Sequence, residues 1–440
     1  MCPKQNYRKV GRKDLSDRRI EIIKNELLGE EMTRIAHPSG LMIYVVRKDF
    51  ASAYAVFGTR YGSFDNAFTL DGERTVVPHG IAHFLEHKMF ETEGGQDTFE
   101  LFSEIGADAN AYTSTDRTAY LFSCTEDFYT AFEVLVNMVA TPVFTEENVK
   151  KEQGIIAQEI KMCEDRPSNT LHYNLMKALY EKSPVRIPIA GTVESIAEIT
   201  PELLYKCCNA FYRMNNMAIC VCGNVDVSEI LKIVDKHIPE NQQEKVVFED
   251  VPDSKGVFMP IISEEKDIAK PLFSIGIKFP EATKENSYAC DILCEALFGM
   301  CEDFYSEIFE SDMVSSYHYY YEFSRASSYF AIGGETPEPD WVLERVRALV
   351  AKALENGIPM DAFERAKRKV YADTVRGFDS SENIAEEMFE SFLAYDGFLD
   401  SAEKYSAVTY DEVLALSKTV LSLDRIAMSA LYPQKEKGQI

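Results

Sequence analysis

The stretch PHGIAHFLEHKMFE runs from Pro78 to Glu91 and contains three of the seven histidines in a chain of 440 residues. Within it, His83, Glu86 and His87 are spaced at i, i+3 and i+4. An α-helix turns by about 100° per residue, so these three side chains would leave one face of a helix together. The stretch therefore predicts a helix that holds a metal ion beside a carboxylate.

The composition of the chain indicates a globular protein. Hydrophobic residues make up 46% and charged residues 27% of the sequence, and a chain of this length can form about two to three domains with complete cores. The formal net charge of −26 argues against a nucleic-acid partner, because such proteins present basic surfaces to phosphates. An acidic surface attracts cationic ligands, so a preference for basic peptides stays open.

We expect a cytoplasmic protein that does not contact a membrane. No uninterrupted apolar run reaches the ~18 residues of a spanning helix, and residues 1–19 lack the apolar segment of a secretory signal. An organellar transit peptide is the alternative, which Asp14 and Asp17 disfavour. The ten cysteines are scattered and are expected to be reduced, with Cys220 and Cys222 in the core of a strand.

Strand-like and helix-like patterns alternate along both halves of the sequence. In the first half we expect strands at 40–49, 51–63, 109–124 and 216–226, and helices at 126–142 and 145–165. In the second half we expect strands at 271–280 and 327–336, and helices at 289–300 and 359–375. Segments that begin at Thr200 and Thr409 are also alike. Each places the start of a strand 17 positions on, at Met217 and Ile426, which indicates a duplicated domain.

The predicted fold is therefore α+β, with two tandem homologous α/β-roll domains. Each domain is expected to pack a mainly antiparallel sheet against helices. The chain divides into an N-terminal tail (1–20), a metal-bearing domain (21–238), a linker (239–256) and a second domain (257–440).

The second copy is expected to have lost the metal site. The segment ACDILCEALF at 289–298 aligns with IAHFLEHKMF at 81–90. Asp291, Cys294 and Glu295 then take the positions of the histidines and the glutamate. One metal ion per chain follows from this alignment.

A hydrolytic zinc site needs a third protein ligand. Catalytic zinc is held by three side chains and keeps a fourth position open, so two histidines are not enough. The helix predicted at 145–165 carries Glu152 and Glu159, seven residues apart and therefore on one face. This spacing does not choose between them.

The motifs resemble those of a known family. HFLEH at 83–87 follows Gly80 and precedes both GADANAYTS at 106–114 and EQGIIAQE at 152–159. Together they resemble the inverzincin signature of the pitrilysin or insulinase family of zinc metallopeptidases. The resemblance extends over nearly the whole chain, duplicated halves included, and is nearest to bacterial processing-peptidase-like members of this length.

The resemblance implies a role for each polar residue of the site. His83, His87 and Glu159 would bind zinc, and Glu86 would be the general base that takes a proton from the attacking water. Glu152 would orient a ligating histidine without binding the metal. His79 is expected to be a neutral neighbour, because it lies at the start of the helix.

The resemblance also identifies a substrate strand. An extended peptide would add to the sheet edge formed by Asn110, Ala111, Tyr112 and Thr113. Arg117 and Tyr120, further along the same segment, are expected to be structural.

One departure from the family pattern concerns the second half. Active members place an arginine and a tyrosine from that half over the zinc, which stabilises the oxyanion. Here Phe309 stands where the arginine is expected, and Tyr317 lies close to the expected tyrosine. We therefore expect a zinc endopeptidase for unstructured peptides that works as the catalytic subunit of a two-chain assembly. Its partner would be a related subunit without HxxEH or, as the runner-up, a second copy of this chain. A non-catalytic scaffold or partner subunit is the alternative function.

Overall fold

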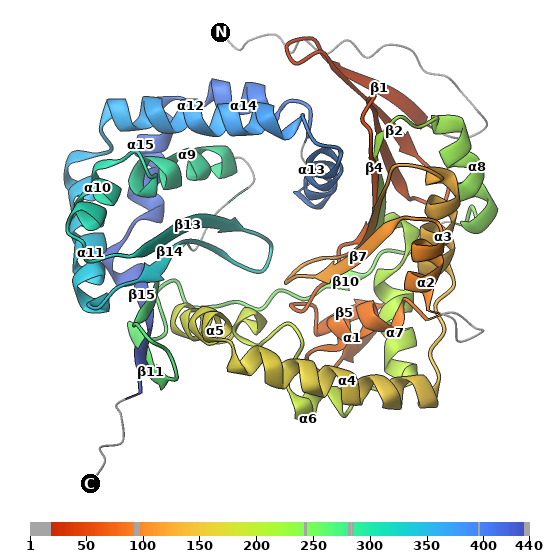
Figure 1. Ribbon diagram of the computed structural model, residues 1–440, viewed down its shortest axis with the longest axis horizontal. Coiled ribbons are helices and arrows are strands. Elements are labelled where there is room, and N and C mark those ends of the chain that lie inside the picture. Colours follow the sequence, from red (N-terminus) through yellow and green to blue (C-terminus); the bar gives the residue numbers. More distant parts are fainter. Residues whose placement is uncertain are drawn as a thin grey trace. The chain divides into compact units, whose positions relative to one another are not determined.

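The computed structural model describes residues 19–91, 97–241, 244–279, 283, 286–394 and 397–434. These residues form two compact units, each of which combines a sheet with helices (Figure 1). The first unit takes in Met1–Gln158, Ile189–Glu249 and Thr374–Ser401, and the second takes in Glu159–Pro188, Asp250–Asp373 and Ala402–Ile440. Of the predicted tail 1–20, only the last two residues are described, and they begin the first strand.

The first unit is built on a seven-stranded sheet of order β1-β2-β3-β9-β4-β8-β7. All neighbours pair antiparallel except β3 and β9. The central strand β9 is buried along its whole length, which explains its continuous apolar sequence. The strands in sheet order are β1 (Arg19–Asn25), β2 (Glu30–Ala36), β3 (Met42–Arg47), β9 (Met217–Gly223), β4 (Ala53–Thr59), β8 (Thr118–Cys124) and β7 (Asp108–Thr113).

A small sheet and several helices complete the first unit. The small sheet has the order β10-β5-β6, with β10 at Val247–Phe248, β5 at Ala67–Leu70 and β6 at Glu73–Val76. The helices are α1 (Ile81–Lys88), α2 (Thr98–Glu104), α3 (Phe128–Ala140), α6 (Val193–Ile196), α7 (Pro201–Phe211), η2 (Met214–Asn216), α8 (Val227–His237) and α13 (Ser381–Ala394). Helix α4 (Glu146–Asp165) begins in the first unit and ends in the second.

The second unit is built on a five-stranded sheet of order β11-β15-β12-β14-β13. The strands in that order are β11 (Ile261–Lys266), β15 (Ile426–Pro433), β12 (Leu272–Lys278), β14 (Ser328–Glu335) and β13 (Ser316–Phe323). The helices are α5 (Pro167–Leu179), η1 (Pro184–Arg186), α9 (Ser287–Phe298), α10 (Asp303–Glu310), α11 (Pro339–Asn356), α14 (Ser401–Ala407), α15 (Tyr410–Val420) and η4 (Leu423–Arg425). Helix α12 (Met360–Gly377) begins in the second unit and ends in the first. Within the described ranges, no helix is both long and apolar enough to cross a bilayer.

The two sheets repeat one topology, which confirms the predicted tandem domains. The order β3-β9-β4-β8-β7 matches β11-β15-β12-β14-β13, and in both sheets only the first two of these strands are parallel. The register matches as well. Gly58 of β4 lies opposite Ala218 of β9, and Gly276 of β12 lies opposite Ala427 of β15.

The compact units nevertheless differ from the predicted domains 21–238 and 257–440, because each half of the sequence contributes a helix to the other unit. Helix α13 packs on β4 and β9 of the first unit, and helix α5 packs on β12 and β15 of the second. The paired glycines mark both contacts. A Cβ atom on Gly58 would lie 2.1 Å from the ring of Phe389, and one on Gly276 would lie 2.9 Å from Leu179. An apolar helix face fits either sheet, so helical periodicity alone does not predict the exchange.

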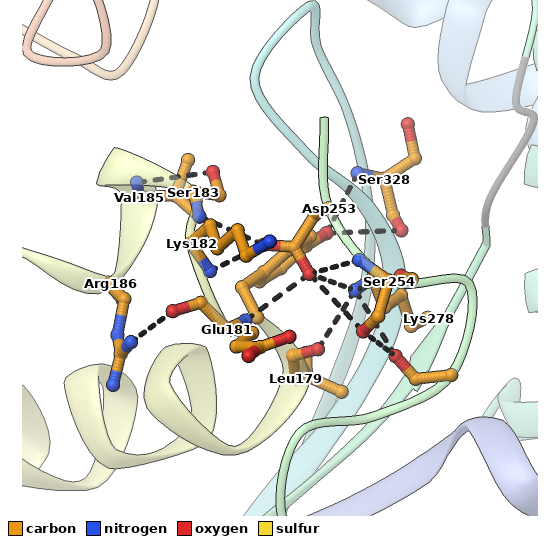
Figure 2. A network of polar contacts seen from close by, with 12 residues as sticks. Leu179, Glu181, Lys182, Ser183, Val185, Arg186, Asp253, Ser254, Lys278 and Ser328 are labelled. Atoms are coloured by element: carbon orange, nitrogen blue, oxygen red, sulfur yellow. Dashed lines mark hydrogen bonds and ion pairs between the residues drawn. The ribbon is translucent and has the colours of Figure 1, made fainter. Parts of the chain in front are cut away.

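The predicted linker 239–256 is anchored where it enters the second unit. The carboxylate of Asp253 accepts hydrogen bonds from three successive backbone N–H groups, those of Glu181, Lys182 and Ser183, at 2.8–3.2 Å (Figure 2). It also pairs at 3.0 Å with Lys278, whose side chain is 3% exposed. Burial alone would raise the pKa of Asp253, but these hydrogen bonds outweigh it and hold the pKa well below its usual range.

Candidate metal centre

Helix α1 presents the histidine motif on the face that is turned away from the core. It begins after Gly80, whose φ of +89° favours glycine and whose Cβ would lie 2.4 Å from the carbonyl oxygen of Ala190. The apolar face of the helix is buried and consists of Ile81, Ala82, Phe84 and Leu85. The side chains of His83, Glu86 and His87 are only partly buried. Helical spacing thus separates these four apolar residues from His83, Glu86 and His87.

The structure brings the three predicted metal ligands together. One ligand atom each from His83, His87 and Glu159 lies within 4.8 Å of the other two, and the two imidazole centroids are 4.6 Å apart. In the part of the chain that the structure describes, this is the only such group of three or more His, Cys, Asp or Glu side chains. Two imidazole nitrogens and one carboxylate oxygen suit zinc and leave a fourth position open. The donor set therefore fits a catalytic zinc ion.

Glu152 lies on α4 and contacts the predicted ligand His87, but it is not one of the three predicted ligands. Its Oε1 atom is 3.1 Å from Nδ1 of His87, and its Oε2 atom is 3.5 Å from Nζ of Lys88. Burial alone would raise the pKa of Glu152, but the hydrogen bond with His87 and the charge of Lys88 outweigh it, so the pKa is lowered. An ionised Glu152 beside His87 is the arrangement by which proteins orient a ligating imidazole.

The neighbouring histidines differ in their surroundings. Burial and the adjacent His87 lower the pKa of His83 to about 4, so its ring is neutral at physiological pH and can donate a nitrogen lone pair to a metal. His79 is not among the grouped ligand atoms. Its backbone carbonyl accepts a hydrogen bond of 2.8 Å from Ser195, and burial lowers the pKa of its ring.

Glu86 is tied to the predicted substrate strand. The hydroxyl of Thr113 donates to its Oε2 atom at 2.5 Å, across the contact between α1 and β7. All four predicted substrate contacts, Asn110 to Thr113, lie on β7, which is the edge strand of its sheet. Tyr112 donates a 2.8 Å hydrogen bond to Glu386 of α13. Since side chains alternate along a strand, Thr113 and Tyr112 point to opposite faces of the sheet.

Two residues that contact the predicted site or its substrate strand were not predicted. Lys88 is fully buried directly after His87, and helical periodicity cannot show that a lysine will be buried. Glu386 lies far along the chain in the helix that the second half contributes to the first unit. No motif in the sequence marks it. The predicted structural residue Arg117 pairs with Glu390 of the same helix, and Tyr120 shares a 2.8 Å hydrogen bond with Tyr212.

In the second unit, the residues at the positions of His83 and His87 form polar contacts within that unit. Asp291 accepts a 2.6 Å hydrogen bond from Tyr405. Glu295 accepts a 2.6 Å hydrogen bond from Tyr319 and lies 3.4 Å from Lys369. The described part of this unit therefore offers no second group of metal ligands.

The structure also shows the surroundings of Phe309 and Tyr317, the residues expected at or near the positions of the family's arginine and tyrosine. Phe309 of α10 is 42% exposed and stacks on Tyr305 with ring centroids 4.9 Å apart. The hydroxyl of Tyr317 donates at 2.8 Å to the backbone carbonyl of Phe298. The nine described cysteines are free, and Cys220 and Cys222 are buried in β9.

Comparisons with known proteins identify the family. Residues 75–193 match the family described as insulinase (peptidase family M16), and residues 198–370 match the peptidase M16 inactive domain. The uncharacterized zinc protease YmfH of Bacillus subtilis is 35% identical over 428 residues, which cover 94% of this chain and all of that protein.

Solved structures agree with this assignment. A protein from Alicyclobacillus acidocaldarius assigned as an M16-like peptidase superposes with a TM-score of 0.88 and 33% identity, over 92% of this chain and 99% of that one. A protease from Helicobacter pylori, 18% identical, shares the fold with a TM-score of 0.80 over 92% of this chain and all of that one. The chain is a member of the M16, or insulinase, family of zinc metallopeptidases.

Proposed function

We propose that this chain is an endopeptidase that hydrolyses unstructured peptides or unfolded protein segments. The observation that carries the proposal is the position of Glu86, on the same helix face as His83 and His87 and in contact with the edge strand β7. His83, His87 and Glu159 would hold the zinc ion. Bound zinc would polarise the scissile carbonyl and lower the pKa of the attacking water to about 7.

Glu86 supplies the proton transfer. Its carboxylate accepts a proton from the attacking water and passes it to the leaving amine, which needs a group with access to both. The hydrogen bond from Thr113 holds one carboxylate oxygen, Oε2, in place. A glutamine at this position could bind peptide but could not accept a proton.

The edge strand β7 provides a surface for the substrate backbone. It pairs with β8 on one side, and no described strand pairs with its other side. An extended peptide can add to such an edge through main-chain hydrogen bonds, which tolerate many sequences. Most backbone N–H and C=O groups of a folded protein are already hydrogen-bonded within it, so unfolded segments are the preferred substrates.

We also propose that the chain is the catalytic subunit of a two-chain assembly with a related subunit that lacks HxxEH. Phe309 supplies no cationic donor for an oxyanion, and the hydroxyl of Tyr317 is bonded to a backbone carbonyl. Loss of one positioned donor costs about 10²–10³ in rate. Light scattering and peptidase assays of the isolated chain test this point. Full activity from a monomer would exclude the assembly.

A non-catalytic partner subunit is the alternative function. It is disfavoured because a scaffold has no use for a carboxylate held between two potential metal ligands. Glu86→Gln separates the two functions. The variant should retain zinc and peptide binding but lose at least about 10²-fold in kcat, measured on a mixed peptide pool by mass spectrometry. Equal turnover by the variant and the natural protein, or no turnover by either with the related subunit present, would reject the peptidase.

A further inference from the structure

Lys88 is an unusual residue to find inside a protein. Its side chain is fully buried, and it directly follows a predicted metal ligand. A buried ammonium group is costly unless its charge is paired. Its Nζ atom lies 2.5 Å from Oε1 of Glu91 and 3.5 Å from Oε2 of Glu152. Both carboxylates therefore compensate its charge.

Packing alone does not require a lysine at this place. In the duplicated helix α9, the position equivalent to Lys88 is occupied by Ala296, which is also buried. The repeated topology thus accepts a small apolar side chain there. The lysine is found only in the copy that carries the histidines.

The contacts of Glu152 indicate what the lysine does. One carboxylate oxygen bonds Nδ1 of His87 at 3.1 Å, and the other oxygen faces Lys88. The carboxylate is therefore held from two sides, and rotation toward the lysine or away from it would break the bond to the histidine. A histidine whose Nδ1 is bonded to a carboxylate binds a metal ion through its other ring nitrogen, Nε2.

We propose that Lys88 is a positioning residue for metal binding, which holds Glu152 in the orientation that presents His87 to zinc. The inference rests on the proposed function, since it assigns His87 as a ligand. Lys88 touches neither substrate nor metal and acts through Glu152.

Two electrostatic effects of Lys88 have opposite signs. Its positive charge would repel a zinc ion, whereas its hold on Glu152 would strengthen binding. Glu91 neutralises the charge at 2.5 Å, so little net repulsion reaches the site. Loss of a residue that supports a metal ligand costs about 10–100-fold in affinity. Removing Lys88 should therefore weaken zinc binding.

The test replaces Lys88 by Met, which has similar length and no charge, and by Gln, which keeps a hydrogen-bond donor. Zinc affinity is measured by competition with a chromophoric chelator. Lys88→Met should bind zinc about 10–100-fold more weakly, and Lys88→Gln should lose less. Lys278→Met is the matched control, because Lys278 is also a buried lysine paired with a carboxylate but lies in the second unit. It should lower the melting temperature and leave zinc affinity unchanged.

A double-mutant cycle shows whether Lys88 acts through Glu152. In a Glu152→Gln background, Lys88→Met should add less than about twofold to the loss, because residues of one network are not additive. ¹⁵N NMR of the metal-free protein should show the Nδ1–H tautomer of His87 in the natural protein and a mixture of tautomers in folded Lys88→Met. A purely structural lysine would leave this ratio unchanged.

The outcomes separate this inference from the proposed function. Zinc binding by Lys88→Met and Lys88→Gln as tight as that of the natural protein, or additive losses in the cycle, would overturn the role of Lys88. If the natural protein binds zinc but cleaves no peptide even with the related subunit present, the endopeptidase proposal fails while the affinity series still decides on Lys88. If one lysine variant does not fold, the other variant supplies the affinity comparison.

Discussion

Helices α1 and α9 hold equivalent positions in two copies of one topology, yet their polar residues have different surroundings. In α1, the histidines lie beside the acidic helix α4, and Glu86 contacts the edge strand β7. In α9, Asp291 and Glu295 are each bonded to a tyrosine hydroxyl. Duplication has preserved the backbone while one copy carries the predicted metal ligands at these positions and the other forms internal hydrogen bonds there.

The edge strands explain part of the difference. Tyr112 of β7 and Tyr320 of β13 are equivalent, because each is joined through one strand to the paired glycines Gly58 and Gly276. The preceding residues are Ala111 and Tyr319, and Tyr319 is the residue that bonds Glu295. A small side chain in the first copy leaves room that a tyrosine occupies in the second. An open metal site thus depends on the neighbouring strand as well as on the helix.

The largest expected effect comes from replacing one residue by alanine at equivalent positions of the two helices. His87→Ala should abolish zinc binding, because two remaining ligands do not hold a catalytic zinc ion. Glu295→Ala, at the equivalent position of α9, should retain about one zinc per chain, because only the first copy carries the predicted ligands. Metal analysis after exhaustive dialysis measures both. Zinc retained by His87→Ala would contradict the assignment of the site.

The two glutamates of α4 should differ in effect although they share a face. Glu159→Gln removes a predicted ligand and should lose zinc nearly completely. Glu152→Gln should keep zinc with affinity weakened by about 10–100-fold, because the amide supports His87 less well. Isothermal titration calorimetry with zinc distinguishes the two variants. The reverse order would exchange the roles of ligand and supporting residue.

The Asp253 network of the second unit should affect stability and not the metal. Because folding lowers the pKa of Asp253 below its ordinary 3.8, its contribution to stability is present above pH 3.8 and is lost as the pH falls toward the folded-state pKa. Asp253→Asn at pH 7 leaves the buried Lys278 without its counter-charge and should cost about 3 kcal/mol of unfolding free energy.

Urea denaturation at pH 7 and at lower pH values checks this prediction. The natural protein and Asp253→Asn should converge in stability as the pH falls below 3.8. Asp361→Asn, which removes an exposed ion pair with Arg365, is the control and should leave the unfolding free energy almost unchanged. Zinc affinity should be the same in all three proteins. An equal cost for both variants would show that the network around Asp253 is no more than a surface contact.

The smallest expected effect concerns the hydrogen bond between Thr113 and Glu86. Thr113→Val keeps the shape of the strand but removes the donor, which should lower kcat by about threefold to tenfold, since one such bond contributes about 1 kcal/mol. KM and zinc content should change little. Steady-state kinetics on a peptide pool measures the effect, and Thr113→Ser should restore activity because it keeps the hydroxyl. A loss of zinc in Thr113→Val would show that the strand supports the metal ligands instead.

The sequence by itself determined the features that depend on local geometry. Spacing at i, i+3 and i+4 places His83, Glu86 and His87 on one face of any helix, and repeated patterns predict the duplicated α+β domains. The loss of the second site follows from Asp291 and Glu295 standing in the aligned helix. The family resemblance, rather than spacing, distinguished Glu159 from Glu152.

Only the tertiary structure decided which elements meet. Helix α13 packs on the first sheet and α5 on the second, because an apolar helix face is compatible with either sheet and long-range packing makes the choice. Tertiary packing also buries Lys88 beside two carboxylates and anchors Asp253 at the end of the predicted linker. These buried charges are stable because folding brings their partners within reach. In the pairs Lys88–Glu152 and Asp253–Lys278, the two partners lie far apart in the sequence.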